Sequence, residues 1–151
     1  MEKLEDIMKY WENDSKVDLT DVSREILNIP ILHSKYLGYM SRHRISERKA
    51  MSDYMKMKRV KWEYYSGKMS KEQLDEYGWE QFPFTLKSDI TTYIESDDDL
   101  IKLMNKKVYH EEAAKYCEYI LKELNQRTWQ LREHLQHERF IHGARWCINW
   151  W

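Results

Sequence analysis

The chain has 151 residues, of which 42% are hydrophobic and 34% charged, and its 25 basic and 26 acidic side chains give a formal net charge of −1. With only 4 Gly and 2 Pro, this composition favours long amphipathic helices over a turn-rich β architecture. Two cysteines give no disulfide framework, and no apolar run approaches the roughly 18 residues that cross a bilayer. The N-terminus also lacks an apolar signal core. We therefore expect a cytosolic chain with reduced thiols.

The N-terminal residues predict a short helix, because apolar side chains fall at helical spacing. These side chains are Leu4, Ile7, Met8 and Trp11. Asn13 to Ser15 end this helix, and Thr20 or Asp21 can cap the next. Pro30 suits the first turn of a further long helix, where its missing N–H is not needed, and Gly67 is a suitable stop.

Basic residues concentrate along this long helix. Residues 35 to 71 hold eleven Lys or Arg and three Asp or Glu, a net charge of +8. The flanking residues 1 to 34 and 72 to 101 have net charges of −4 and −8, and residues 102 to 151 have +3. A localised block of this kind favours a polyanion site. The alternative is a solvated helix whose cations pair with the acidic blocks, within the chain or between subunits.

A single helix over this segment would have two distinct faces. One face is apolar and carries Leu37, Met40, Met51, Met55, Trp62 and Tyr65. The opposite side carries a ridge of cations spaced seven residues apart, Lys35, Arg42, Lys49 and Lys56. Arg59 and Lys61 fall on either flank of the apolar face, and Gly38 or Ser46 could divide the helix in two.

The segment from Lys56 to Lys68 mixes basic and aromatic side chains. Cations neutralise phosphates without reading sequence, and aromatic rings offer faces on which any base can stack, so this mixture is typical of single-stranded nucleic acid binding. Helix geometry nevertheless turns the aromatic residues toward a core, as anchors for the cations. From the pattern alone, the ridge that includes Arg42, Lys49 and Lys56 is favoured as a phosphate track, and Lys58, Arg59, Lys61 and Lys68 of this segment are further predicted DNA-binding residues.

Residues 68 to 87 are predicted to form a connector. Ser70 can cap a short helix over Lys71 to Tyr77, which Gly78 and Pro83 end.

The next residues are predicted to start two more helices. Ser88 can cap one over Asp89 to Glu95, and Ser96 with Asp97 to Asp99 opens a long C-terminal helix. Because exposed N–H groups at a helix start favour negative charge, we interpret the aspartates as a helix start and not as a metal site.

An apolar seam runs along the C-terminal helix. Its members alternate spacings of four and three, at Cys117, Leu121, Leu124, Thr128, Leu131 and Leu135. This pattern is typical of helices that pack on helices, in a core or a coiled coil. We assign the apolar members to oligomerisation, because elongated amphipathic helices leave an apolar stripe that needs a partner. The pattern does not set the number of subunits.

Three histidines of this helix, His134, His137 and His142, lie at spacings that could chelate a metal, with Glu138 between them. No further Cys, Asp or Glu completes a zinc pattern, and Arg139 is close in sequence. The chain also has no Gly-rich phosphate loop and no nucleophile motif. We therefore predict a protein that is not an enzyme and needs no metal or cofactor.

Residues 59 to 67, Arg-Val-Lys-Trp-Glu-Tyr-Tyr-Ser-Gly, resemble the hallmark of the UvsY family of phage recombination mediators: basic, any, basic, bulky, acidic, then Tyr, Tyr, Ser, Gly. Three other segments resemble that family in the same order along the chain: residues 4 to 6, residues 32 to 37, and residues 125 to 140 with Gly143 after them. Together they cover nearly the whole chain.

The resemblance implies a mainly α protein with at most minor β structure that binds single-stranded DNA and assembles as a ring-like homo-oligomer through its C-terminal helix. It implies loading of a phage recombinase onto DNA coated by the phage single-strand-binding protein, in recombination, repair and recombination-dependent replication, in the cytoplasm of the infected bacterial host. The family's DNA-contacting basic pair falls on Arg59 and Lys61, so the resemblance makes this pair the primary DNA contact and the ridge of cations auxiliary. We expect residues 1-87 to form the DNA-binding part and 88-151 the oligomerisation part.

Three features depart from the family. Trp62 stands where an aliphatic residue is typical, Lys58 is an additional cation, and the tail from Ala144 to Trp151 runs past the expected end. We expect the tail residues Trp146, Trp150 and Trp151 to pack between subunits rather than stack on bases. The alternative function is a structural coiled-coil protein whose basic block binds an acidic protein partner. A third class, a metal-dependent hydrolase, would use Asp97 to Asp99 or the histidines.

Overall fold

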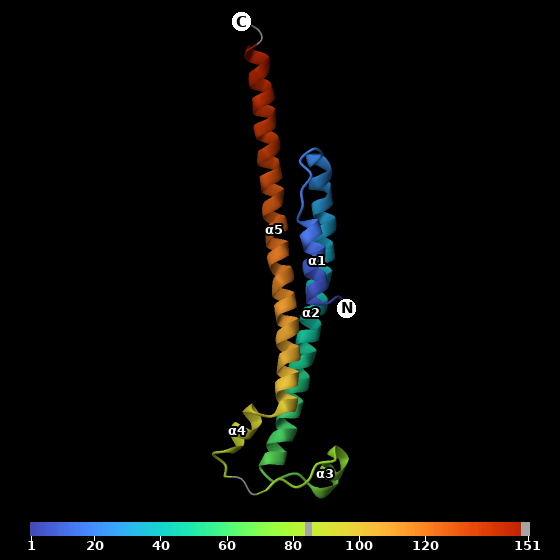
Figure 1. The fold of residues 1–151 in the computed structure, drawn as a ribbon, viewed down its shortest axis with the longest axis vertical. Coiled ribbons are helices and arrows are strands. Elements are labelled where there is room, and N and C mark those ends of the chain that lie inside the picture. The colour runs from blue at the N-terminus through green and yellow to red at the C-terminus, as the bar shows by residue number, and fades with distance from the viewer. Residues whose placement is uncertain (84–85, 149–151) are drawn as a thin grey trace. The chain divides into compact units, whose positions relative to one another are not determined.

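The computed structural model describes residues 1–83 and 86–148, with side chains described as far as residue 143 (Figure 1). This part of the chain holds helices and no strand, which confirms the predicted mainly α class. The helices are α1 (Leu4–Asp14), α2 (Val22–Tyr65), α3 (Lys71–Tyr77), α4 (Ile90–Glu95) and α5 (Asp98–Ile148). None of them has an apolar stretch long enough to cross a membrane. Trp150, Trp151 and the Trp146 side chain lie outside the described residues, so their role stays a prediction.

Helix α2 starts earlier than predicted. The Oδ1 atom of Asp21 accepts a hydrogen bond from the Arg24 N–H at 3.1 Å, which confirms Asp21 as a cap. Pro30 lies inside the helix rather than in its first turn, which corrects the prediction. An internal proline removes one helical hydrogen bond, and the buried neighbours Ile29 and Leu32 hold the helix through it by packing into the core. The helix also continues through Gly38 and Ser46, the two residues at which the sequence pattern allows a break.

The buried stripe of α2 differs from the apolar face that the sequence pattern predicts. Every seventh residue packs toward the interior: Val22, Ile29, Tyr36, His43, Ala50 and Met57. Of the residues expected to be buried, Leu37, Met55 and Trp62 are exposed. The prediction was wrong because the true stripe includes small and polar residues, which a search for large apolar side chains passes over.

Contacts divide the chain into two units. The first unit contains residues 1 to 43 and the C-terminal residues from 113 onward, and the second contains residues 44 to 112. These two units are defined by contacts within the chain. The predicted division into a DNA-binding part, residues 1-87, and an oligomerisation part, residues 88-151, concerns function and stays a prediction.

The second unit packs the short helices against the ends of the two long ones. Its core contains Ile90, Ile94 and Leu100, with Tyr54, Met57 and Tyr65 against them. Helix α3 begins with the predicted cap, because the Ser70 Oγ accepts from the Gln73 N–H at 3.3 Å, and ends at Gly78, with φ 67°. The prediction that Ser88 caps α4 was wrong, because its hydroxyl instead donates to the Asp89 carboxylate at 2.8 Å.

The first unit packs α1 and the N-terminal half of α2 against α5. Its core contains Ile7, Val22, Ile29, Leu32, Tyr36, Cys117, Ile120, Leu121, Leu124 and Leu131, with Leu135 among the residues packed against it. The apolar seam of α5 therefore has a partner inside its own chain. Its predicted role in oligomerisation stays a prediction. The large hydrophobic side chains of α5 that are exposed in this unit, among the described residues, are Tyr119, Trp129 and Phe140.

Arg127 is a buried cation at the edge of this core. Its Nη1 and Nη2 atoms donate to the backbone carbonyls of Asp14 and Ser15, each at 3.0 Å, and its guanidinium carbon lies 5.3 Å from the centroid of the Trp11 ring. Because carbonyls at the end of a helix lack helical partners and form the negative end of its dipole, Arg127 completes α1 and attaches it to α5.

We expect Arg127→Met to lower the free energy of unfolding by about 2 kcal/mol, because methionine keeps the packing but leaves two carbonyls without donors. Urea denaturation followed by circular dichroism measures this difference. The matched control is Arg132→Met, on the exposed side of the same helix, which should shift stability by less than about 0.5 kcal/mol. Equal losses in the two variants would contradict the capping role of Arg127.

Candidate nucleic-acid interface

The motif at residues 59 to 67 forms the end of α2 and the turn that follows it. Gly67 has φ 69°, its N–H donates to the Tyr64 carbonyl at 3.1 Å, and the Lys68 N–H donates to the Glu63 carbonyl at 3.0 Å. This is a Schellman ending, in which a left-handed residue closes a helix, so the predicted stop at Gly67 is confirmed. The turn brings the Lys68 ammonium back to 4.5 Å from the centroid of the Trp62 ring.

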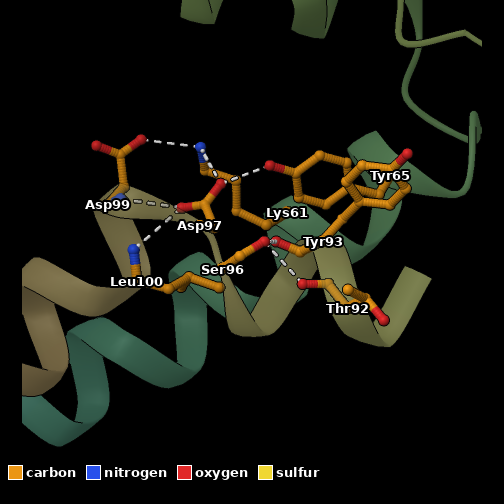
Figure 2. Close-up of polar contacts among 8 residues, drawn as sticks. All are labelled: Lys61, Tyr65, Thr92, Tyr93, Ser96, Asp97, Asp99 and Leu100. Carbon is orange, nitrogen blue, oxygen red and sulfur yellow. Dashed lines mark hydrogen bonds and ion pairs between the residues drawn. The ribbon is translucent and has the colours of Figure 1, made fainter. Parts of the chain in front are cut away.

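Lys61 points into the second unit and is only 6% exposed. Its Nζ atom lies 2.9 Å from Oδ2 of Asp97 and 2.8 Å from Oδ2 of Asp99. Figure 2 shows the ammonium between the two carboxylates. It also lies 4.4 Å from the centroid of the Trp79 ring. The hydroxyl of Tyr65 donates to the same Asp97 oxygen at 2.7 Å. The Lys61 charge is therefore paired within the chain.

Asp97 joins this ion pair to the start of α5. Its Oδ1 atom accepts hydrogen bonds from the N–H groups of Asp99 at 3.0 Å and Leu100 at 3.1 Å, while Oδ2 contacts Lys61 and Tyr65 (Figure 2). The interpretation of the aspartates as a helix start is thus confirmed. One carboxylate caps α5 and binds the last turns of α2.

The pKa values in this cluster show that the ion pair outweighs burial. Burial acts to raise the pKa of Asp97, but hydrogen bonds from Lys61 and Tyr65 bring it below its usual value. Burial acts to lower the pKa of Lys61, but its hydrogen bonds to Asp99 and Asp97 raise it overall. Burial and the Asp97 carboxylate both raise the pKa of the Tyr65 hydroxyl, which stays a neutral donor. Both members of the ion pair are charged at neutral pH.

Arg59 lies on the other side of the helix, because two residues along a helix are separated by about 200°. It is exposed, and it makes no ion pair within the described residues. The structure therefore places the two cations of the motif on opposite sides of α2. One is available to a ligand, and the other is held in the interior.

The other predicted DNA-binding residues fall in two environments. Arg42 belongs to the first unit, where its guanidinium lies 3.0 Å from the Glu2 carboxylate and stacks on Tyr39 at 5.1 Å. Four of them, Lys49, Lys56, Lys58 and Lys68, belong to the second unit and are exposed. Neither Lys49 nor Lys56 forms an ion pair with another described residue. The predicted ridge is therefore paired in the first unit and available in the second.

Trp62 is a candidate site residue that the sequence pattern assigned to the core. It is 43% exposed, because the interior of this part of α2 is taken by Lys61 and Met57. Arg59 and Lys58 precede Trp62 by three and four residues, so they neighbour it on the helix surface. With Lys68 against its ring, Trp62 is an exposed indole surrounded by cations. A sequence signal for this exposed, cation-flanked indole does exist: two basic residues stand three and four positions before the tryptophan, which places them beside it on the helix surface.

The neighbouring aromatic residues have the anchoring role that the sequence predicts. Tyr64 contacts Trp79 at 4.9 Å and Phe82 at 5.4 Å between ring centroids, and Tyr65 stacks on Tyr93 at 5.5 Å. These contacts attach the connector and α4 to the end of α2. The exposed cations are thus held on a packed support.

The ion pair predicts a pH-dependent contribution to stability. Because the pKa of Asp97 is lowered, its contribution is present above the usual value of 3.8 and is lost as the pH falls through the lowered pKa. Because the pKa of Lys61 is raised, its contribution is present below the usual value of 10.5 and is lost as the pH rises through the raised pKa. We expect Lys61→Met to lower the free energy of unfolding by about 3 kcal/mol at pH 7, since it leaves Asp97 buried and unpaired.

Urea denaturation from pH 7 down to pH 3 measures this difference, which should shrink as the pH falls, because protonation relieves the buried, unpaired Asp97 of the variant while the ion pair of the unmodified chain loses its contribution below pH 3.8. The control Lys56→Met removes an exposed, unpaired cation and should change stability little at any pH. A difference between Lys61→Met and the unmodified chain that stays constant down to pH 3 would contradict the role of the ion pair.

The chain matches a known family over most of its length. Residues 10–144 match the model of the family described as recombination, repair and ssDNA binding protein UvsY. No curated protein sequence matches the chain significantly.

The fold is shared with crystal structures of the bacteriophage T4 recombination mediator protein UvsY. The lattice type II structure gives a TM-score of 0.79 at 21% identity and covers 95% of this chain and 99% of that chain. Lattice type IV gives 0.75 at 20% identity, with coverage of 93% and 99%, and lattice type I gives 0.73 at 20%, with coverage of 91% and 98%. The fold and the family model agree with the resemblance seen in the motif at residues 59 to 67. The chain belongs to the UvsY family of recombination, repair and single-stranded-DNA-binding proteins.

Proposed function

We propose that this protein is a recombination mediator that binds single-stranded DNA and promotes loading of a phage recombinase onto DNA coated by a single-strand-binding protein. It acts as a homo-oligomer in the cytoplasm of the infected host. Family membership and the net charge of +8 over residues 35 to 71 support the proposal. The observation that carries it is the exposed, unpaired Arg59 among further exposed cations of α2.

The outer face of α2 suits a DNA backbone of any sequence. Arg59, Lys56 and Lys49 have no ion-pair partner among the described residues, so phosphates would not have to displace an internal carboxylate. Phosphate contacts position the strand and carry no sequence information. Binding should therefore be strongly salt-dependent and show little sequence preference.

The two cations of the motif have different roles in this proposal. Arg59 contacts phosphate, whereas Lys61 is a positioning residue that holds the end of α2 through Asp97 and Asp99. Loss of either would weaken DNA binding, but for different reasons. Arg59 supplies a contact, and Lys61 supplies the support for that contact.

We expect Arg59→Gln to flatten the dependence of log affinity on log salt concentration by about 0.7, the effect of losing one phosphate contact on single-stranded DNA. Fluorescence anisotropy with a labelled oligothymidylate at several salt concentrations measures the slope. Unfolding stability should remain within about 0.5 kcal/mol of the unmodified chain, because Arg59 has no partner to lose. Arg132→Gln, on α5, is the matched control and should leave the slope unchanged.

The proposal fails if Arg59→Gln leaves the slope unchanged. Lys61→Met should weaken binding only together with its loss of folding stability. Absence of single-strand binding by the unmodified protein at moderate salt would instead favour the coiled-coil alternative with an acidic protein partner.

Recombinase loading is tested separately from DNA binding. On single-stranded DNA coated with the phage single-strand-binding protein, addition of this protein should shorten the lag before the recombinase begins DNA-dependent ATP hydrolysis. Arg59→Gln should lengthen the lag relative to the unmodified protein, whereas Arg132→Gln should not. A lag that is the same with and without this protein would contradict the mediator function.

A further inference from the structure

A groove of about 740 Å³ lies in the second unit, between the end of α2 and the start of α4. Its lining includes Trp62, Lys68, Leu86, Lys87, Ile90 and Ile94. The aliphatic residues form an apolar surface, and both lysines are exposed. The groove thus combines an indole, an apolar wall and two ammonium groups.

The charge of the groove indicates a polyanionic ligand. None of its described lining residues is acidic. Lys58 and Arg59 lie on the turn of α2 that precedes Trp62, so the positive charge continues outside the groove along the helix surface. An apolar peptide segment would bury these cations without compensation, whereas a nucleotide offers them phosphate.

Trp62 and Lys68 lie close enough together to contact the same stretch of a nucleic-acid strand. The Lys68 Nζ atom lies only 4.5 Å from the centroid of the indole ring. A phosphate bound to Lys68 therefore brings its own or a neighbouring base within reach of the same ring. Stacking on an aromatic side chain tolerates every base, because each base has a π face.

We propose that this groove binds one unstacked base of single-stranded DNA, with the base against the Trp62 indole and the adjacent phosphates at Lys68 and Lys87. The inference rests on the proposed function and deepens it. Arg59 and the neighbouring cations hold the backbone, and the groove holds a base. The protein thereby binds a strand whose bases are not paired, and discriminates against duplex DNA, in which the bases are stacked and paired.

The test compares two oligonucleotides of equal length and charge, an oligothymidylate and an abasic strand, by competition at one salt concentration. The unmodified protein should bind the oligothymidylate at least about 5-fold more tightly, the lower end of what stacking of one base contributes. Trp62→Leu should reduce this ratio by at least about 5-fold and leave the affinity for the abasic strand unchanged. Trp129→Leu, at an exposed tryptophan of the first unit, is the matched control and should keep the ratio.

A second variant keeps the Trp62 indole and fills the groove with a larger side chain. Thr91 is an exposed residue of the groove, and Thr91→Phe should reduce the ratio as Trp62→Leu does. This variant decides the question if Trp62→Leu does not fold, as judged by its urea midpoint.

Three outcomes are decisive. A reduced ratio in Trp62→Leu or Thr91→Phe, with abasic binding retained, supports the groove. An equal affinity of the unmodified protein for both strands, or an unchanged ratio in both variants, overturns the groove and leaves the proposed function intact. Failure of the unmodified protein to bind either strand overturns the proposed function and the groove together.

Discussion

The buried ion pair between Lys61 and Asp97 determines the arrangement of the second unit. One oxygen of Asp97 caps α5, and the other binds the Lys61 ammonium at 2.9 Å and the Tyr65 hydroxyl at 2.7 Å. A buried ion pair stabilises a fold only when further hydrogen bonds offset the cost of desolvation. Asp99 and Tyr65 supply them here, so the end of one long helix is joined to the start of the next across the whole connector.

This interaction also sets which face of α2 is presented to solvent. With Lys61 directed inward, Arg59 must lie outside, because the two residues are about 200° apart around the helix. Trp62 follows Arg59 by one turn and is exposed on the same side. The burial of one basic residue thus produces an outer surface of cations around an indole, and that surface is the basis of both proposals on DNA.

The first unit shows the same dependence on tertiary contacts. The seam of α5 is easily recognised from its spacing, but spacing alone does not distinguish a partner in another chain from one in the same chain. In the structure α1 and α2 cover the seam, and Arg127 closes its edge by donating to the carbonyls of Asp14 and Ser15. A single cation thus completes one helix and joins it to another more than a hundred residues away.

The sequence by itself determined the helical class, the family, the basic block and several helix ends, including Ser70, Gly67 and Gly78. These features depend on composition, on ordered motifs, or on hydrogen bonds between residues a few positions apart. Only the tertiary structure decided that Lys61 is buried, that Trp62 is exposed and that the seam is covered within the chain. The Lys61 and Asp99 side chains that meet are 38 residues apart, so neither local spacing nor hydropathy could show that a lysine would be buried and a tryptophan exposed.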